Sequence, residues 1–88
     1  MRTPERHFEI CKELNAIYAK KNHDYGDSFH KTFEEWGPAV VGIRLTDKLN
    51  RFTQLAKGNE AQVNDESIVD TLNDLANYAI MARMEYEE

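Results

Sequence analysis

The sequence predicts an all-α fold, a small bundle of three long helices and one short helix that forms a single domain over residues 1–88. Two observations predict it. Apolar residues recur at steps of three and four along most of the chain, which is the period of an amphipathic helix. No segment alternates apolar and polar residues as a strand with one buried face would.

The first long helix is expected over residues 4–21. Thr3 is a suitable N-cap, and Pro4 suits the first helical position. The apolar stripe of this helix consists of Phe8, Ile10, Cys11, Leu14, Ile17 and Tyr18. As the single cysteine, Cys11 forms no internal disulfide, and we expect it to be a buried apolar residue. The helical pattern is then broken by His23, Asp24 and Gly26.

A short helix is expected over residues 28–36, with Asp27 or Ser28 as its cap. Its aromatic residues are spaced four and three apart, so they share one face. We expect two of them, Phe33 and Trp36, to close the end of the bundle. The glycine–proline pair that follows ends this helix and begins the next.

Two further long helices are expected over residues 38–57 and 64–85, separated by the polar segment GNEAQVN. The core stripe of the first consists of Val41, Leu45, Leu49, Phe52 and Ala56. The core stripe of the second consists of Ile68, Leu72, Leu75, Ala76 and Ala79. The helix over residues 38–57 is expected to end at Gly58.

The composition favours a thin core and a cytoplasmic protein. With 41% hydrophobic and 31% charged residues, the chain is expected to self-associate as a dimer or tetramer, because a domain of this size buries only about 60–65% of its unfolded surface. The formal charge of −5 argues against a nucleic-acid polymer as partner, but it is compatible with a small nucleotide and a divalent metal ion. No apolar run has the length of a membrane span or a signal peptide, so no membrane partner is expected.

One side of the last expected helix is rich in oxygen ligands. It carries Glu66, Asp70, Asn73 and Asn77, with Asp74 beside them. Met81 and Met84 project onto the same side, and no lysine or arginine occurs between residues 57 and 83 to relieve the repulsion of the aspartates. Acids at this spacing can share one hard cation, and Mg²⁺ is the metal we expect. The alternative is an ordinary solvated face.

A complementary cationic cluster lies on the helix expected over residues 38–57. Arg44, Lys48 and Arg51 fall on one side of it, and Asp47 and Asn50 flank them. Packed against the acidic side of the last helix, this cluster would bind phosphate groups. The alternative is a solvated basic face with local ion pairs at four-residue spacing.

The connector KKNHDYGDSFHKTFEEWG, residues 20–37, carries residue types that are found in nucleotide pockets. We expect Tyr25 and Phe29 to stack on a base, and Gly26 to let the backbone approach the ligand. Polar edges of the base are expected to contact His23, Asp24 and Ser28. The alternative is that the aromatic residues of the connector only close the bundle.

Three blocks of the sequence occur in order between Tyr18 and the end of the last expected helix. They are Tyr18-x-x-Lys21-x-x-Asp24-Tyr25-Gly26-x-Ser28-Phe29, RLTDKLNR and DESIVDTLNDLANYAIM. Together they resemble the nucleotide modification associated domain, type 1, a family commonly encoded by bacteriophages and bacteria. That family is distantly similar to the MazG-like all-α nucleoside triphosphate pyrophosphatases, which form helical oligomers.

The resemblance implies Mg²⁺-dependent hydrolysis of a nucleoside triphosphate to a monophosphate and pyrophosphate. MazG-like enzymes bind the metal through acids on two helices, one of which bears Glu-x-x-Asp. Asp70 matches the aspartate of that motif, and Glu66 is the nearest glutamate, one residue further away than in the motif. Where those enzymes carry Glu-Glu-x-x-Glu, this chain has only Asp47 and Asn50, so fewer carboxylates are available to the metal.

We therefore expect a nucleotide-handling domain that acts as a Mg²⁺-dependent nucleoside triphosphate pyrophosphohydrolase. The expected catalytic residues are Asp47, Glu66 and Asp70, and the expected metal ligands are these three and Asp74. The expected nucleotide-binding residues are Lys21, Asp24, Tyr25, Gly26, Ser28, Phe29, Arg44, Lys48, Arg51 and Asn77. Two alternatives stay open, namely a protein that binds or sequesters nucleotides without turnover and a helical protein-interaction module.

Overall fold

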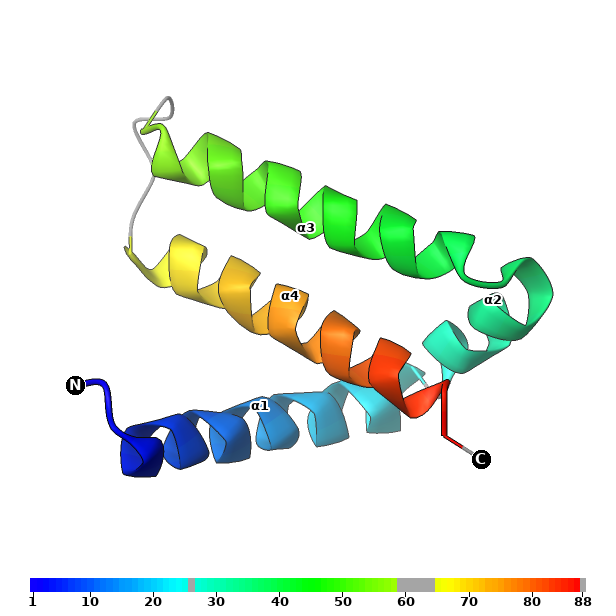
Figure 1. The fold of residues 1–88 in the computed structure, drawn as a ribbon, viewed down its shortest axis with the longest axis horizontal. Helices are drawn as coiled ribbons and strands as arrows, with labels where there is room; N and C mark the ends of the chain where they lie inside the picture. Colours follow the sequence, from blue (N-terminus) through cyan, green and yellow to red (C-terminus); the bar gives the residue numbers. More distant parts are fainter. Residues whose placement is uncertain (26, 59–64, 88) are drawn as a thin grey trace.

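The computed structural model describes residues 1–25, 27–58 and 65–87, except for the side chains of residues 24, 25 and 65–67. These residues form four helices and no strand, which confirms the all-α prediction (Figure 1). The helices are α1 (Pro4–Tyr25), α2 (Ser28–Trp36), α3 (Ala39–Ala56) and α4 (Asp65–Met84). Within this part of the chain, no helix combines the length and the apolar character needed to cross a bilayer.

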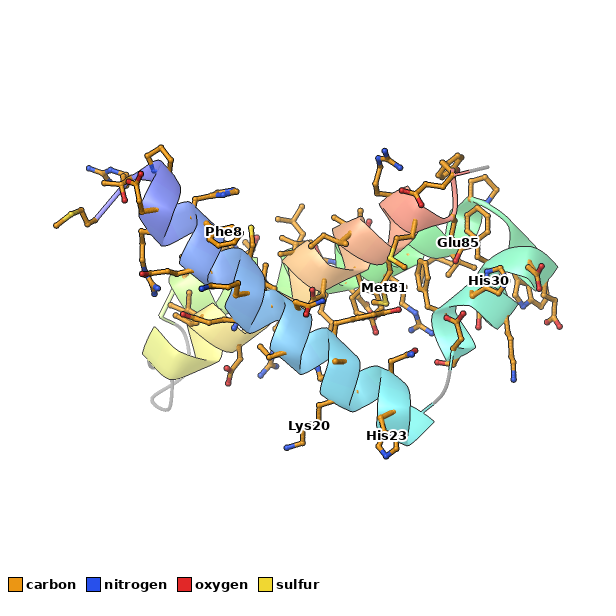
Figure 2. All side chains as sticks on the ribbon, turned by 90° about the horizontal axis from the view of Figure 1, so that it is seen from below. Phe8, Lys20, His23, His30, Met81 and Glu85 are labelled. Carbon is orange, nitrogen blue, oxygen red and sulfur yellow. The ribbon has the colours of Figure 1, made fainter. Side chains whose placement is uncertain are left out.

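Helix α4 lies at the centre of the arrangement. Helices α3 and α4 run antiparallel and side by side, and α1 lies on the other side of α4 (Figure 1). Seen from below, α1 crosses α4 at an angle (Figure 2). The short helix α2 turns the chain from α1 into α3 at the end of the molecule where α4 finishes (Figure 1). Two sides of α4 are therefore covered, one by α3 and one by α1.

Local signals set the ends of several helices. The Arg6 backbone N–H donates a hydrogen bond to the Thr3 Oγ1 atom at 3.0 Å, which confirms Thr3 as the cap of α1. Asp27 occupies the cap position of α2 without a side-chain capping bond. Gly37 (φ 74°) and Gly58 (φ 67°) follow α2 and α3 in the left-handed region, which glycine enters without steric cost.

Helix α1 continues about one turn beyond its expected end at Lys21, so that prediction is wrong. The apolar period marks the residues of a helix that pack on a neighbour, whereas its backbone hydrogen bonds can continue past the last of them. His23 lies in this last turn of α1, where a basic residue suits the negative end of the helix dipole. The extension has a consequence for the site, because it places Lys21 inside a helix rather than at its last residue.

The buried core is small and lies toward the α2 end of the bundle. One cluster joins Phe29 of α2, Val40 of α3 and Ala82 of α4. The partly buried residues that pack against this cluster are Val41, Tyr78 and Met81. Helix α1 contributes Leu14, its buried apolar residue in the described part of the chain. The core thus ties α2, α3 and the second half of α4 firmly together and holds α1 through fewer contacts.

Several apolar residues that were expected in the core are exposed. Cys11 is exposed, so the prediction of a buried thiol is wrong. Trp36 is 67% exposed and does not close the bundle, whereas Phe33 packs edge-to-face on Tyr86 with ring centroids 5.8 Å apart. The other exposed residues of the expected stripes are Phe8, Ile10, Leu49, Ala56, Leu72 and Ala79. Helical periodicity selects the apolar face of each helix, but a single short chain has too few elements to cover every such face.

A charged contact holds the end of α4 on α2. The His30 Nδ1 atom lies 2.8 Å from the Glu85 Oε1 atom, and the His30 Nε2 atom lies 3.4 Å from the Glu34 Oε2 atom. Figure 2 shows the side chains of His30 and Glu85 next to each other at this end of the molecule. Because both ring nitrogens face carboxylates, the contact favours the protonated imidazole.

The hydrogen bond to Glu85 raises the pKa of His30 above its ordinary 6.5, and the negative charges of Glu34 and Asp27 act in the same direction. A pKa that is raised in the folded state gives stability that is present below pH 6.5 and is lost as the pH rises through the raised value. We therefore expect the free energy of unfolding to fall as the pH rises through this window. Urea unfolding of a His30→Gln variant should lack that fall, whereas a His23→Gln control should keep it. A His30→Gln variant with the parent's pH dependence would contradict the assignment.

Candidate functional site

A carboxylate held between two lysines joins the three long helices. The Lys21 Nζ atom on α1 lies 3.0 Å from the Asp74 Oδ1 atom on α4, and the Lys48 Nζ atom on α3 lies 3.4 Å from the Asp74 Oδ2 atom. Each carboxylate oxygen therefore has its own ammonium partner. The Asp74 and Lys48 side chains are only 31% and 27% exposed, so this contact is less screened by solvent than an ordinary surface pair.

The position of Asp74 on α4 explains why the two lysines meet there. Asp74 faces the seam where α1 and α3 approach α4 from two sides, so it can receive a cation from each. The three side chains carry two positive charges and one negative charge. This local excess of positive charge lies in a chain whose formal net charge is −5. The two ammonium groups are therefore the groups of this site that an anion would contact.

A cavity of about 160 Å³ opens beside this ion pair. It is lined by Tyr18, Lys21, Lys48, Asp74, Asn77, Tyr78 and Met81. A second cavity of about 90 Å³ adjoins it and is lined by Tyr18, Lys21, Asn22, Asp27, Ser28, Phe29, Tyr78 and Met81. The two cavities share four of these residues, Tyr18, Lys21, Tyr78 and Met81. Because the cavities share these lining residues, a ligand larger than a phosphate group would extend from one cavity into the other.

Aromatic rings form much of the lining of the two cavities. The Phe29 and Tyr78 rings lie with their centroids 5.9 Å apart and their planes tilted by 51°. The Lys48 Nζ atom lies 5.9 Å from the centroid of the Tyr78 ring, within the range of a cation–π contact. Tyr18 of α1 lines both cavities from the other side. The site thus places apolar ring surface directly beside ammonium groups.

The Asn77 side chain links α4 to α1 at the inner end of the larger cavity. Its Nδ2 atom donates a hydrogen bond to the Leu14 backbone carbonyl at 3.2 Å, and Asn77 is buried. Because a carbonyl oxygen can only accept, the amide nitrogen must face Leu14. The Oδ1 atom is then the remaining acceptor of this amide, on a residue that lines the cavity.

The structure brings together six of the residues predicted for the site. Those that line the two cavities are Lys21, Ser28, Phe29, Lys48, Asp74 and Asn77. Asp47, Arg51 and Asp70 are exposed and do not line them. Arg44 is exposed too and lines a different cavity, between α2 and α3. The remaining predicted residues, whose side chains lie outside the described part of the chain, are Asp24, Tyr25, Gly26 and Glu66.

The predicted Mg²⁺ ligands do not form a cluster within the described part of the chain. No group of three or more His, Cys, Asp or Glu side chains is placed there to hold a metal ion. Asp74 is the predicted metal ligand that lines a cavity, and its two oxygens already face lysines. Any Mg²⁺ bound here would therefore share Asp74 with phosphate oxygens and water, which is a common mode of Mg²⁺ binding.

Tyr18 and Tyr78 line these cavities, although neither was predicted from the sequence as a site residue. Tyr18 was assigned to the apolar stripe of its helix, and the structure places it at the cavities. Tyr78 follows Asp74 by four residues and therefore lies next to it on the same face of α4. That spacing could have identified Tyr78. The position of Tyr18 depends on how α1 crosses α4, which the sequence does not reveal.

Residues 21–86 match the family model described as Nucleotide modification associated domain 1. The chain belongs to this family. In this nucleotide modification associated domain, the matched range begins at Lys21 and contains α2, α3 and α4, with Lys48 and Asp74. No curated protein and no solved structure matches the chain. The family predicted from the three sequence blocks is therefore confirmed, and the relation to MazG-like pyrophosphatases stays a prediction.

Replacing Asn77 by alanine in this nucleotide modification associated domain should loosen α1 from α4. The change removes the hydrogen bond to Leu14 and leaves a small gap, so we expect a loss of roughly 1–2 kcal/mol in the free energy of unfolding. Urea denaturation at a fixed protein concentration measures this. The matched control is Asn50→Ala on the exposed face of α3, with an expected change within about 0.5 kcal/mol. Equal losses in the two variants would contradict the role of Asn77.

Proposed function

We propose that this domain binds nucleotides in the two adjoining cavities between α1, α2, α3 and α4. One observation supports the proposal above the others. The Lys21–Asp74–Lys48 contact combines two cations with a carboxylate at a cavity whose walls are aromatic rings. A nucleotide is the common metabolite that joins an aromatic base to a strongly anionic group. The family description, which refers to nucleotide modification, agrees with this ligand class.

In this proposal the phosphate groups bind to Lys21 and Lys48. A phosphate carries more negative charge than Asp74 and can accept hydrogen bonds from both ammonium groups. Lys48 is the more buried of the two lysines, so its bond to a phosphate oxygen is less weakened by water. The base then lies against the Phe29 and Tyr78 rings, where stacking contributes on the order of 1–3 kcal/mol per base.

Mg²⁺ is part of the proposal as a companion of the phosphates. Displaced from the lysines, the Asp74 carboxylate would be available to the metal, and phosphate oxygens and water would complete its shell. The Asn77 Oδ1 atom is a neutral acceptor nearby in the same cavity wall. The metal would supply charge neutralisation, and the chain's own residues would fix the orientation of the nucleotide.

The second candidate function is hydrolysis of a nucleoside triphosphate to a monophosphate and pyrophosphate. The observation that favours it is the position of Asp70, which lies one helical turn before Asp74 on α4 and is exposed to solvent. A carboxylate there can approach a metal ion on the nucleotide or orient a water molecule. Asp47 on α3 and Glu66 on α4 are the further acids that this reaction would recruit.

We also propose how the domain assembles and in which compartment it works. We propose a homo-oligomer, because the core within one chain is small. We propose a reducing compartment, the cytoplasm, because the exposed thiol of Cys11 would not persist in an oxidising one.

Nucleotide binding is tested by changing each lysine of the site to methionine. Loss of a charge-assisted hydrogen bond should weaken binding about 10-fold for Lys21→Met and up to about 100-fold for the more buried Lys48→Met. Isothermal titration calorimetry with a panel of ribonucleoside and deoxyribonucleoside triphosphates, with and without Mg²⁺, gives the affinities. Lys20→Met is the matched control. This substitution changes the net charge by the same amount, but the Lys20 side chain points away from α4 (Figure 2). If no nucleotide binds or raises the melting temperature of the parent, the proposal fails and an interaction module remains.

Hydrolysis is tested separately by following pyrophosphate release. If Asp70 acts on the metal or the water, Asp70→Asn should abolish turnover while the affinity for nucleotide measured by calorimetry changes by less than about 10-fold. Far-UV circular dichroism should show the same helix content as the parent, because Asp70 is exposed. Nucleotide affinity without pyrophosphate release in the parent would assign the domain to binding alone.

A further inference from the structure

An apolar stripe runs along the side of α4 that neither α1 nor α3 covers. Its residues recur at steps of three and four and are Val69, Leu72, Ala76, Ile80 and Met84. Four of them are large, and each of these is between 43% and 51% exposed. A solvent-facing side of a helix normally carries charged or polar residues, so this stripe is suited to contact with another protein surface.

The first half of α1 adds a second exposed apolar surface beside this stripe. Phe8 is 61% exposed, and Ile10 and Cys11 are exposed as well. A cavity of about 310 Å³ lies where the two helices meet and is lined by Cys11, Asn15, Tyr18, Asn77, Ile80 and Met84. Helices α1 and α4 thus form a concave apolar corner, which we call the α1–α4 corner.

The exposed area of the chain is larger than that of a compact monomer of the same mass. A compact monomer of 10.3 kDa is expected to expose about 5,400 Å², whereas this chain exposes 6973 Å². The difference of about 1,600 Å² exceeds the roughly 800 Å² that one partner buries in an interface of standard size. Two copies that each bury this area would share an interface of about 3,200 Å², which falls within the range of obligate homodimers, whose interfaces resemble a protein core divided between two chains.

We propose that a second copy of this chain packs on the α1–α4 corner. A two-fold arrangement would place the α4 stripe and the α1 surface of one copy against the same elements of the other. The stripe from Val69 to Ile80 contains no charged residue on its own line, which suits the centre of an interface, where charged residues are depleted. The Lys12 ammonium group, 5.1 Å from the centroid of the Phe8 ring, suits a polar rim.

The proposed dimer would also support the nucleotide cavity, and only this statement rests on the proposed function. Tyr18 and Asn77 line the corner cavity on one side and the 160 Å³ cavity on the other. A partner that fills the corner would therefore contact both side chains on the side opposite the 160 Å³ cavity. The dimer itself follows from the exposed apolar surface and does not require a nucleotide.

Sedimentation equilibrium of the full chain without ligand tests the proposal. The parent should be a dimer or a higher even oligomer at micromolar concentration, and Ile80→Glu should weaken its association at least about 100-fold, because a charge would be buried at the interface centre. Ile43→Glu is the matched control, since Ile43 is 61% exposed on α3 and lies outside the corner. It should leave the association unchanged. A monomeric parent, or equal effects of the two variants, would overturn the proposal.

The native thiol of Cys11 gives a second measurement that needs no variant. Because Cys11 lines the corner, its reaction with a thiol reagent should slow at least about 10-fold as the parent passes from monomer to dimer with rising concentration. If Cys11 reacted as fast in a parent shown by sedimentation to be dimeric as it does in the urea-unfolded chain, the proposal would be overturned even if Ile80→Glu failed to fold. Lys48→Met changes the nucleotide site on α3, outside the corner, and should dimerise like the parent whether or not it binds nucleotide, so failure of the nucleotide site and failure of the interface are distinguishable.

Discussion

The contact of Asp74 with Lys21 and Lys48 is the interaction on which the organisation of this molecule depends. It joins three helices at one point, through residues that are far apart in the sequence. A carboxylate that is only 31% exposed is costly without cationic partners, so the contact constrains how α1 and α3 pack on α4. The same contact places two ammonium groups together in an acidic protein, and it borders the cavities that we assign to a nucleotide.

The buried core is concentrated at one end of the molecule, which explains why apolar residues stay exposed elsewhere. Buried apolar residues gather where α2, α3 and the end of α4 meet, and the His30–Glu85 contact closes that end. Helix α1 is held mainly by Leu14, by the Asn77 amide and by Lys21. Its first half and the outer side of α4 therefore keep their apolar residues on the surface. One short chain has too few helices to cover all its apolar faces. This explains both the thin core and the exposed apolar corner, and it is the reason for proposing a dimer.

The sequence pattern predicted which two helices would bring acids and cations together, but not which of these side chains would meet. It placed acids and cations on facing sides of two helices, and Asp74 and Lys48 do meet. It treated Asp70 and Asp74 as one line, although Asp70 is exposed and Asp74 is partly buried. Rotating α4 about its axis by a few tens of degrees would change which of the two aspartates is buried. Apolar periodicity does not define the orientation of a helix that precisely. Glu66 lies outside the described side chains, so its part in the acidic line stays a prediction.

The sequence alone determined the helical class, the short helix between two long ones, the caps at Thr3, Gly37 and Gly58, and the family. These features depend on neighbours within a few residues or on motifs read directly along the chain. Only the tertiary structure decided that Lys21 pairs with Asp74, that Tyr18 of α1 reaches the site, that Cys11 is exposed, and that one apolar side of α4 has no cover. Those outcomes depend on where α1 crosses α4, and many weak contacts between distant residues set that crossing.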